Sequence, residues 1–150
     1  MKPAKGIRGK LDKLFSELVR ERANWTCEAC GKQYKQEDRM GLHCSHFFSR
    51  RYTATRWHPD NAASHCFGCH QRLGSNPIEF SQWIQAHIGQ QAVDELARLR
   101  NTLPRWRDPQ YRDLLDHLRI ELDMMRAKRT NGEAGRIEFM AWEGNVELAA

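Results

Sequence analysis

Two long stretches of the chain place their apolar residues on one side of a helix. In residues 9–23 the apolar positions recur at i, i+3, i+4, i+7 and i+8, and from about Pro109 they alternate at steps of four and three. Both spacings predict amphipathic helices that bury one face. We interpret the second stripe as core packing, with a dimer seam as the alternative. The positions are Leu11, Leu14, Phe15, Leu18 and Val19, then Tyr111, Leu115, Leu118, Leu122 and Met125.

A third helix is marked by its ends rather than by its apolar face. Asn76 is a suitable N-cap, Pro77 suits the first helical position and Glu79 the third. Gly89 is placed to end this helix. A further helix is predicted from about residue 90 to residue 101.

The remaining segments have weaker helical patterns. Residues 25–40 indicate a cysteine knuckle, and residues 41–58, rich in aromatic and β-branched types, predict a short hairpin or an irregular loop. Residues 65–73 are predicted to form a short helix. Residues 130–150 are acidic and predict a loosely ordered tail, in which residues 137–142 could dock as a strand or short helix.

The charge distribution points to a polyanionic partner. The chain of 150 residues has a formal net charge of +5, concentrated in its basic N-terminal part and in Arg50, Arg51 and Arg56, which have no acidic neighbour between His43 and His58. Such a basic body suits DNA, although a basic surface also serves solubility. No apolar stretch is long enough to span a membrane and no secretory signal is visible, so we expect a cytoplasmic protein.

Four of the five cysteines form two Cys-x-x-Cys pairs, and 35 residues separate the pairs. Two such knuckles can surround one ion tetrahedrally, and a site closed by four thiolates leaves no position for a substrate. We therefore predict one structural Zn²⁺ bound by Cys27, Cys30, Cys66 and Cys69. A redox pair or unrelated buried cysteines are the alternatives. Cys44 is interpreted as a small buried side chain.

The segment around the second cysteine pair carries a family resemblance. His46, Asn61 and His70 have the spacing of the HNH (ββα-metal) endonucleases, in which this module is joined to a zinc bound by four cysteines. Within that superfamily the chain most resembles the phage NinG/Rap recombination nucleases. The matching segments are the two cysteine pairs, Ser45-His46-Phe47, Ser49-Arg50 and Arg56-Trp57-His-Pro-Asp-Asn61.

The resemblance covers about residues 25–89 and implies a zinc-stapled ββα-metal module there. The apolar spacing and the caps predict an N-terminal amphipathic helix before this module and C-terminal helices after it, so we expect an α+β, mostly helical fold. We accordingly expect a single HNH nuclease domain over residues 1–129. Within it, residues 90–129 form a helical cap, and the acidic tail of residues 130–150 follows.

The resemblance also assigns catalytic roles. His46 would be the general base, Asn61 would hold it in place, and His70 would bind a catalytic divalent ion, Mg²⁺ or Mn²⁺. Many HNH enzymes have a second metal ligand, Asp or His, directly before the base, and here that position is Ser45. Either Ser45 contacts the ion, directly or through a water, or His43 supplies the ligand. Strand alternation would place His43 on the same side as Ser45, which favours His43.

These observations predict a divalent-metal-dependent DNA endonuclease. Arg50, Arg51 and Arg56 are expected to bind phosphates. By resemblance, the substrate is branched DNA, a Holliday junction or D-loop, in a phage-infected or prophage-carrying bacterium, with a homodimer and other recombination proteins as further partners. The alternatives are a noncatalytic zinc-finger DNA-binding protein and a sequence-specific HNH nuclease that cuts linear duplex.

Overall fold

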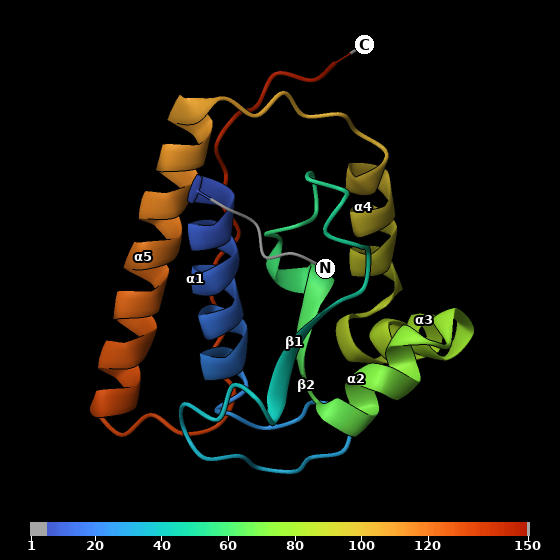
Figure 1. The fold of residues 1–150 in the computed structure, drawn as a ribbon, viewed down its shortest axis with the longest axis vertical. Coiled ribbons are helices and arrows are strands. Elements are labelled where there is room, and N and C mark those ends of the chain that lie inside the picture. Colours follow the sequence, from blue (N-terminus) through green and yellow to red (C-terminus); the bar gives the residue numbers. More distant parts are fainter. Residues whose placement is uncertain (1–5, 150) are drawn as a thin grey trace.

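The computed structural model describes residues 6–149. Five α-helices and one two-stranded antiparallel sheet make up this part of the chain, which is an α+β fold (Figure 1). No helix within it is both long and apolar enough to cross a membrane. In chain order the elements are α1 (Gly6–Arg22), β1 (Leu42–His46), the short 3₁₀ helix η1 (Pro59–Asn61), β2 (Ala62–Cys66), α2 (Phe67–Gly74), α3 (Pro77–Ile88), α4 (Gln90–Arg100) and α5 (Asp108–Thr130).

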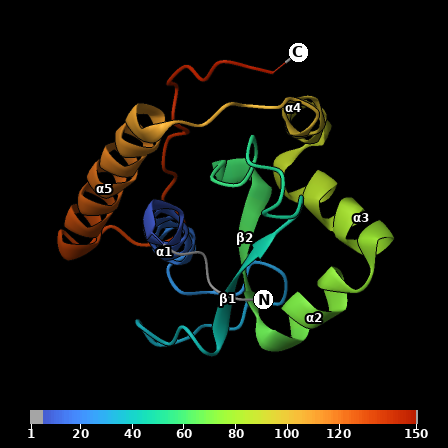
Figure 2. The same cartoon turned by 45° about the horizontal axis from the view of Figure 1, so that its top comes forward.

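The hairpin of β1 and β2 is covered on both faces. It lies between α1 on one side and α2 with α3 on the other (Figure 2). Its register pairs His43 with His65 and Ser45 with Ala63. A two-stranded sheet alone is marginally stable in water, so the helices on its two faces provide the burial that it needs.

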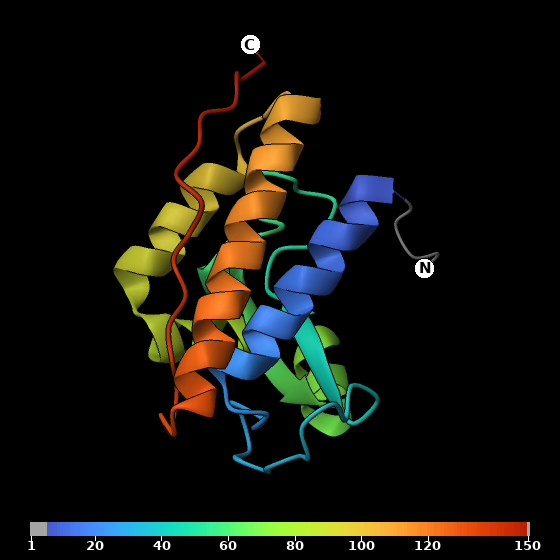
Figure 3. The ribbon, with the colours of Figure 1, turned by 90° about the vertical axis from the view of Figure 1, so that its left-hand side faces the viewer.

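Helices α1 and α5 lie side by side and run in the same direction (Figure 3). Near their starts the Arg8 Nε donates to the Tyr111 hydroxyl at 3.0 Å, and near their ends the Arg129 Nη2 donates to the Glu21 carbonyl at 2.6 Å. The apolar stripe predicted for α5 is buried against α1 in the main core. Core packing is thus confirmed, and the stripe no longer suggests a dimer seam.

The capping residues predicted for α3 are confirmed. Asn76 Oδ1 accepts a hydrogen bond from the Glu79 N–H at 3.2 Å, and Pro77 is the first helical residue. Gly89 follows Ile88 with a φ of 88°. That left-handed backbone favours glycine, and it redirects the chain into α4.

Residues 131–149 differ from the loosely ordered tail that composition suggested. They form an extended segment that returns along α5 (Figure 3), and Ile137 and Phe139 are buried in the main core. The Ile137 N–H donates to the Arg22 carbonyl at 3.0 Å, and Leu148 forms a bridge with Pro104. The docking considered for residues 137–142 occurs, but without a helix or a ladder of strand pairs.

The packing of the tail makes a prediction about stability. The Phe139 side chain is 4% exposed and its ring meets Phe15 edge-on, with centroids 6.0 Å apart. Phe139→Ala should lower the free energy of unfolding by about 3 kcal/mol, because it opens a cavity in the core. Met140→Ala is the matched control, since Met140 is 64% exposed and should change it by less than about 0.5 kcal/mol. If both variants change the free energy of unfolding in urea melts by the same small amount, the tail is not docked in the core.

Candidate metal centre and catalytic site

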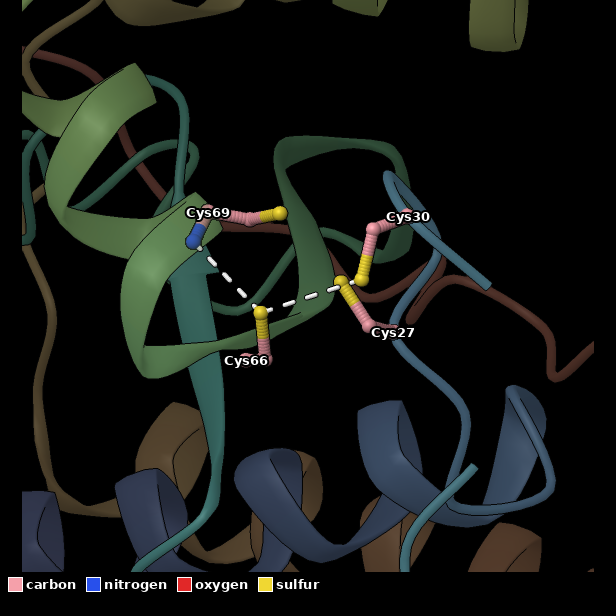
Figure 4. Close-up of side chains that lie close together, drawn as sticks. All are labelled: Cys27, Cys30, Cys66 and Cys69. Carbon is pink, nitrogen blue, oxygen red and sulfur yellow. Dashed lines mark hydrogen bonds between the residues drawn. The ribbon is translucent and has the colours of Figure 1, made fainter. Parts of the chain in front are cut away.

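Four cysteines from two distant segments meet at one end of the hairpin. Cys27 and Cys30 lie in the knuckle after α1, Cys66 ends β2, and Cys69 lies in the first turn of α2 (Figure 4). All four sulfur atoms lie within 4.8 Å of one another. Tetrahedral zinc with Zn–S bonds of about 2.3 Å requires sulfurs about 3.8 Å apart. Cys30 Sγ and Cys66 Sγ are 3.9 Å apart, so the cluster fits a structural zinc.

Local backbone geometry directs these sulfurs inward. In the knuckle the Gly31 N–H donates to the Cys27 carbonyl at 2.8 Å, in a turn that Gly31 permits with its φ of 80°. Cys66 is the N-cap of α2, and its sulfur accepts a hydrogen bond from the Cys69 N–H at 3.5 Å. Burial alone would raise the pKa of Cys66, but hydrogen bonds from Cys69 and the neighbouring thiols lower it to about 7. The Cys66 thiolate is therefore accessible near neutral pH, whereas burial and the neighbouring thiols raise the pKa of Cys69 to about 12.

Cys44 lies apart from this cluster. It faces α1 from the middle of β1, and burial raises its pKa to about 11. A thiol held neutral in this way behaves as a small apolar side chain, as the sequence indicated.

Glu28 braces the knuckle against the rest of the molecule, a role that the sequence did not reveal. Its Oε2 accepts the Ser64 N–H at 2.8 Å, and its Oε1 accepts Arg136 Nε at 2.9 Å. Burial raises the pKa of this carboxyl, but its partners His87, Arg22, Ser64 and Arg136 outweigh that effect and lower it to about 2. The charged carboxylate thus connects the knuckle to β2, α3 and the tail.

The structure brings His43, Ser45 and His70 together on the α2 side of β1. The imidazoles of His43 and His70 are stacked, with centroids 5.2 Å apart and planes 9° apart, and Ser45 Oγ lies 2.5 Å from His70 Nδ1. His43 Nε2 is buried and has no hydrogen-bond partner. Within residues 6–149 the four cysteines are the only group of three or more His, Cys, Asp or Glu placed to hold an ion. An ion at His43 and His70 would therefore need water, hydroxyl or substrate oxygens as its other ligands.

His65 lies opposite His43 in the hairpin and is fully buried. Its ring meets Trp83 edge-on, with centroids 4.7 Å apart. Burial lowers its pKa to about 4. It therefore packs as a neutral core residue.

His46 lies at the end of β1 and faces α1. Its ring centroid is 5.7 Å from that of Phe15, and its Nε2 lies 3.0 Å from the Arg56 carbonyl oxygen. A carbonyl can only accept, so the ring nitrogen facing it carries the proton and the other keeps its lone pair. Burial lowers the pKa of His46 to about 4. No contact joins His46 to His70 in the described part of the chain, and the two lie on opposite sides of β1.

Asn61 holds the loop that follows His46. Its Oδ1 accepts the Phe48 N–H at 2.8 Å, and its Nδ2 donates to the carbonyls of Phe48 and Thr55, both at 3.0 Å. The side chain is completely buried. Asn61 thus ties the start of the loop to its end.

The three arginines of this loop differ in what they can do. Arg56 is 8% exposed, and its guanidinium donates from Nε and Nη2 to the two carboxylate oxygens of Asp12 at 3.0 and 2.6 Å. It is therefore occupied as an anchor and not placed as the expected phosphate clamp. Arg50 Nη1 also reaches Asp12, at 3.4 Å. Arg51 is exposed, and its guanidinium lies over the Tyr52 ring.

Comparison with known protein families gives a match over most of the chain. The model of the family described as bacteriophage lambda NinG protein matches residues 1–128, which is most of the chain. The chain belongs to the NinG family. NinG is a family related to phage recombination. Neither the curated proteins nor the solved structures gave a match to this chain.

The cysteine cluster predicts that this NinG chain binds one zinc. Cys69→Ser should lose the metal and several kcal/mol of stability, because zinc binding at four thiolates contributes directly to folding. Cys44→Ser is the control and should retain a full equivalent of zinc. Metal content by mass spectrometry and thermal melts would measure both effects. Equal zinc in the two variants would contradict the site.

The buried His46 makes the stability of the NinG fold depend on pH. Its folded pKa of about 4 lies below the usual value of 6.5, so the unfolded chain binds the proton more readily. The contribution of neutral His46 to the free energy of unfolding is complete above pH 6.5, and it is lost as the pH falls toward 4. Wild type should lose up to about 2 kcal/mol more than His46→Gln between pH 6.5 and 5. Parallel losses of unfolding free energy in the two proteins would show that His46 is not responsible.

Proposed function

We propose that this NinG-family protein is a divalent-metal-dependent DNA endonuclease. The observation that carries the proposal is the state of His46, which is neutral, fixed against the Arg56 carbonyl and placed beside a loop held by Asn61. A general base must be unprotonated and oriented at working pH. His46 is unprotonated over the neutral range, and its contact with the Arg56 carbonyl orients the ring, which supports this role.

In the proposed reaction, the general base lies on the α1 side of β1 and the metal ligands lie on its α2 side. On the α1 side, the free ring nitrogen of His46 takes a proton from a water molecule, whose oxygen attacks the phosphorus while the bond to the 3′ oxygen breaks. On the α2 side, His70 and His43 would hold the divalent ion, and the Ser45 hydroxyl orients the His70 ring. Such an ion supplies Lewis-acid stabilisation of the phosphate and of the leaving oxygen.

The proposed substrate is branched DNA formed during phage recombination, a Holliday junction or D-loop. Membership of the recombination-related NinG family supports this choice over a sequence-specific nuclease on linear duplex. The net charge of +5 and the exposed Arg51 support a polyanionic substrate.

The test is cleavage of labelled four-way junction, D-loop and matched linear duplex with Mg²⁺ or Mn²⁺. Wild type should cut the branched substrates, and His46→Ala should lower the rate about 10²–10⁴-fold, because it removes the general base. His117→Ala is the matched control, since His117 lies on α5 and contacts the tail through the Met140 carbonyl.

The outcomes separate the alternatives. Equal cutting of linear duplex would keep the nuclease and remove the preference for branched DNA. An absence of cutting with either metal, while wild type and His46→Ala bind DNA equally, would instead favour a noncatalytic zinc-finger DNA-binding protein.

A further inference from the structure

Four side chains from two elements form a cluster of guanidinium groups on aromatic rings, hereafter the arginine–aromatic cluster: Phe48, Arg51, Tyr52 and Arg100. Arg100, the last residue of α4, places its Cζ 4.7 Å from the centroid of the Phe48 ring and 5.5 Å from that of Tyr52. Arg51 places its Cζ 5.1 Å from the Tyr52 centroid. Two cations are therefore held beside one tyrosine.

The positive charges of this cluster have no carboxylate partner within the described residues. In residues 6–149 no carboxylate oxygen lies within 4.0 Å of the Arg51 or the Arg100 guanidinium, and Arg100 donates from Nη2 only to the Asn101 side chain, at 3.3 Å. By contrast, Arg56 is paired with Asp12. On α4 itself, Arg98 is paired with Glu95 through two hydrogen bonds of 2.8 and 2.6 Å.

The cluster has a fixed position relative to His46. Phe48 follows His46 by two residues, and its backbone N–H and carbonyl are both bound by the buried Asn61 side chain. Arg100 lies over that same Phe48 ring. A group bound by the cluster would therefore stand at a set distance from the proposed general base.

We propose that the arginine–aromatic cluster binds DNA backbone phosphates that neighbour the scissile phosphate, and that Arg100 of α4 is a DNA-contacting residue. This inference rests on the proposed function and extends it to α4, which had no assigned role. A guanidinium stacked on an aromatic face keeps its in-plane N–H groups directed outward, in the geometry that phosphate oxygens accept. Two uncompensated guanidinium groups close together favour an anion that carries several charges, such as a DNA backbone.

The test compares Arg100→Gln with Arg98→Gln, which removes the same charge two residues away on the same helix. Both are made in the His46→Ala background, so that binding to a labelled four-way junction is measured without cleavage. Arg100→Gln should weaken binding about 10-fold and lower the slope of log K against log salt by about 1 between about 50 and 200 mM salt. Arg98→Gln should bind within about 2-fold of its parent, because Glu95 already neutralises Arg98.

A purely structural role for Arg100 would give a different result. If Arg100 only holds the loop against α4, binding weakens while the salt slope stays unchanged, and that outcome overturns the proposal. Equal binding by the Arg100→Gln and Arg98→Gln variants overturns it as well. Arg100→Lys keeps the charge and should restore the slope. Failure of the proposed nuclease function can be distinguished from failure of the Arg100 proposal. It would appear as absent cleavage or absent DNA binding by the protein with Arg100 intact.

Discussion

The loop between β1 and η1 has no strand or helix of its own, and two polar side chains hold it. Asn61 binds it from within, through the backbone of Phe48 and Thr55, and Asp12 of α1 binds it from outside. Asp12 accepts hydrogen bonds from Arg56 and from Trp57 Nε1, the latter at 3.0 Å. Partly buried charges are costly unless they are paired, so these contacts select one loop conformation. This loop conformation determines where His46 and the arginine–aromatic cluster lie.

The hairpin depends on its neighbours in a similar way. Arg22, at the end of α1, is 1% exposed and donates to the carbonyls of Pro59 and Ala62 at 2.8 and 2.5 Å. It thereby joins the first helix to the start of β2, while the four-cysteine cluster joins the knuckle to its end. The two-stranded sheet is thus held at both ends by interactions other than the hydrogen bonds between its strands. A bound zinc would strengthen the end that carries the four cysteines.

Local sequence signals predicted most of the helices, because apolar periodicity and caps such as Asn76 act within a few residues. They did not predict β2: residues 62–64 had no assigned element, and residues 65 and 66 were placed in a short helix. The reason is that Ala62–Cys66 is buried on nearly every side and lacks the alternation of a half-exposed strand. The cysteine cluster followed from its spacing. The pairing of Arg56 did not, because its partner Asp12 lies 44 residues away. Arg100 was missed for the same reason, since its aromatic partners are about 50 residues earlier. The catalytic roles of His46, Asn61 and His70 stay predictions that the family resemblance implies.

The parallel pairing of α1 with α5 determines when the protein can fold during its synthesis. The contacts between α1 and α5 join residues more than 100 positions apart, as in the pairs Arg8–Tyr111 and Glu21–Arg129. At about 5–20 residues per second, α1 is made roughly 5–20 s before its partner. The part of its apolar face that packs against α5 and the tail, including the side of Phe15 that meets Phe139, stays uncovered on the nascent chain during that interval. The knuckle and the second cysteine pair are complete far earlier. The cysteine module can therefore assemble first on the ribosome, and the core of α1, α5 and the tail closes last.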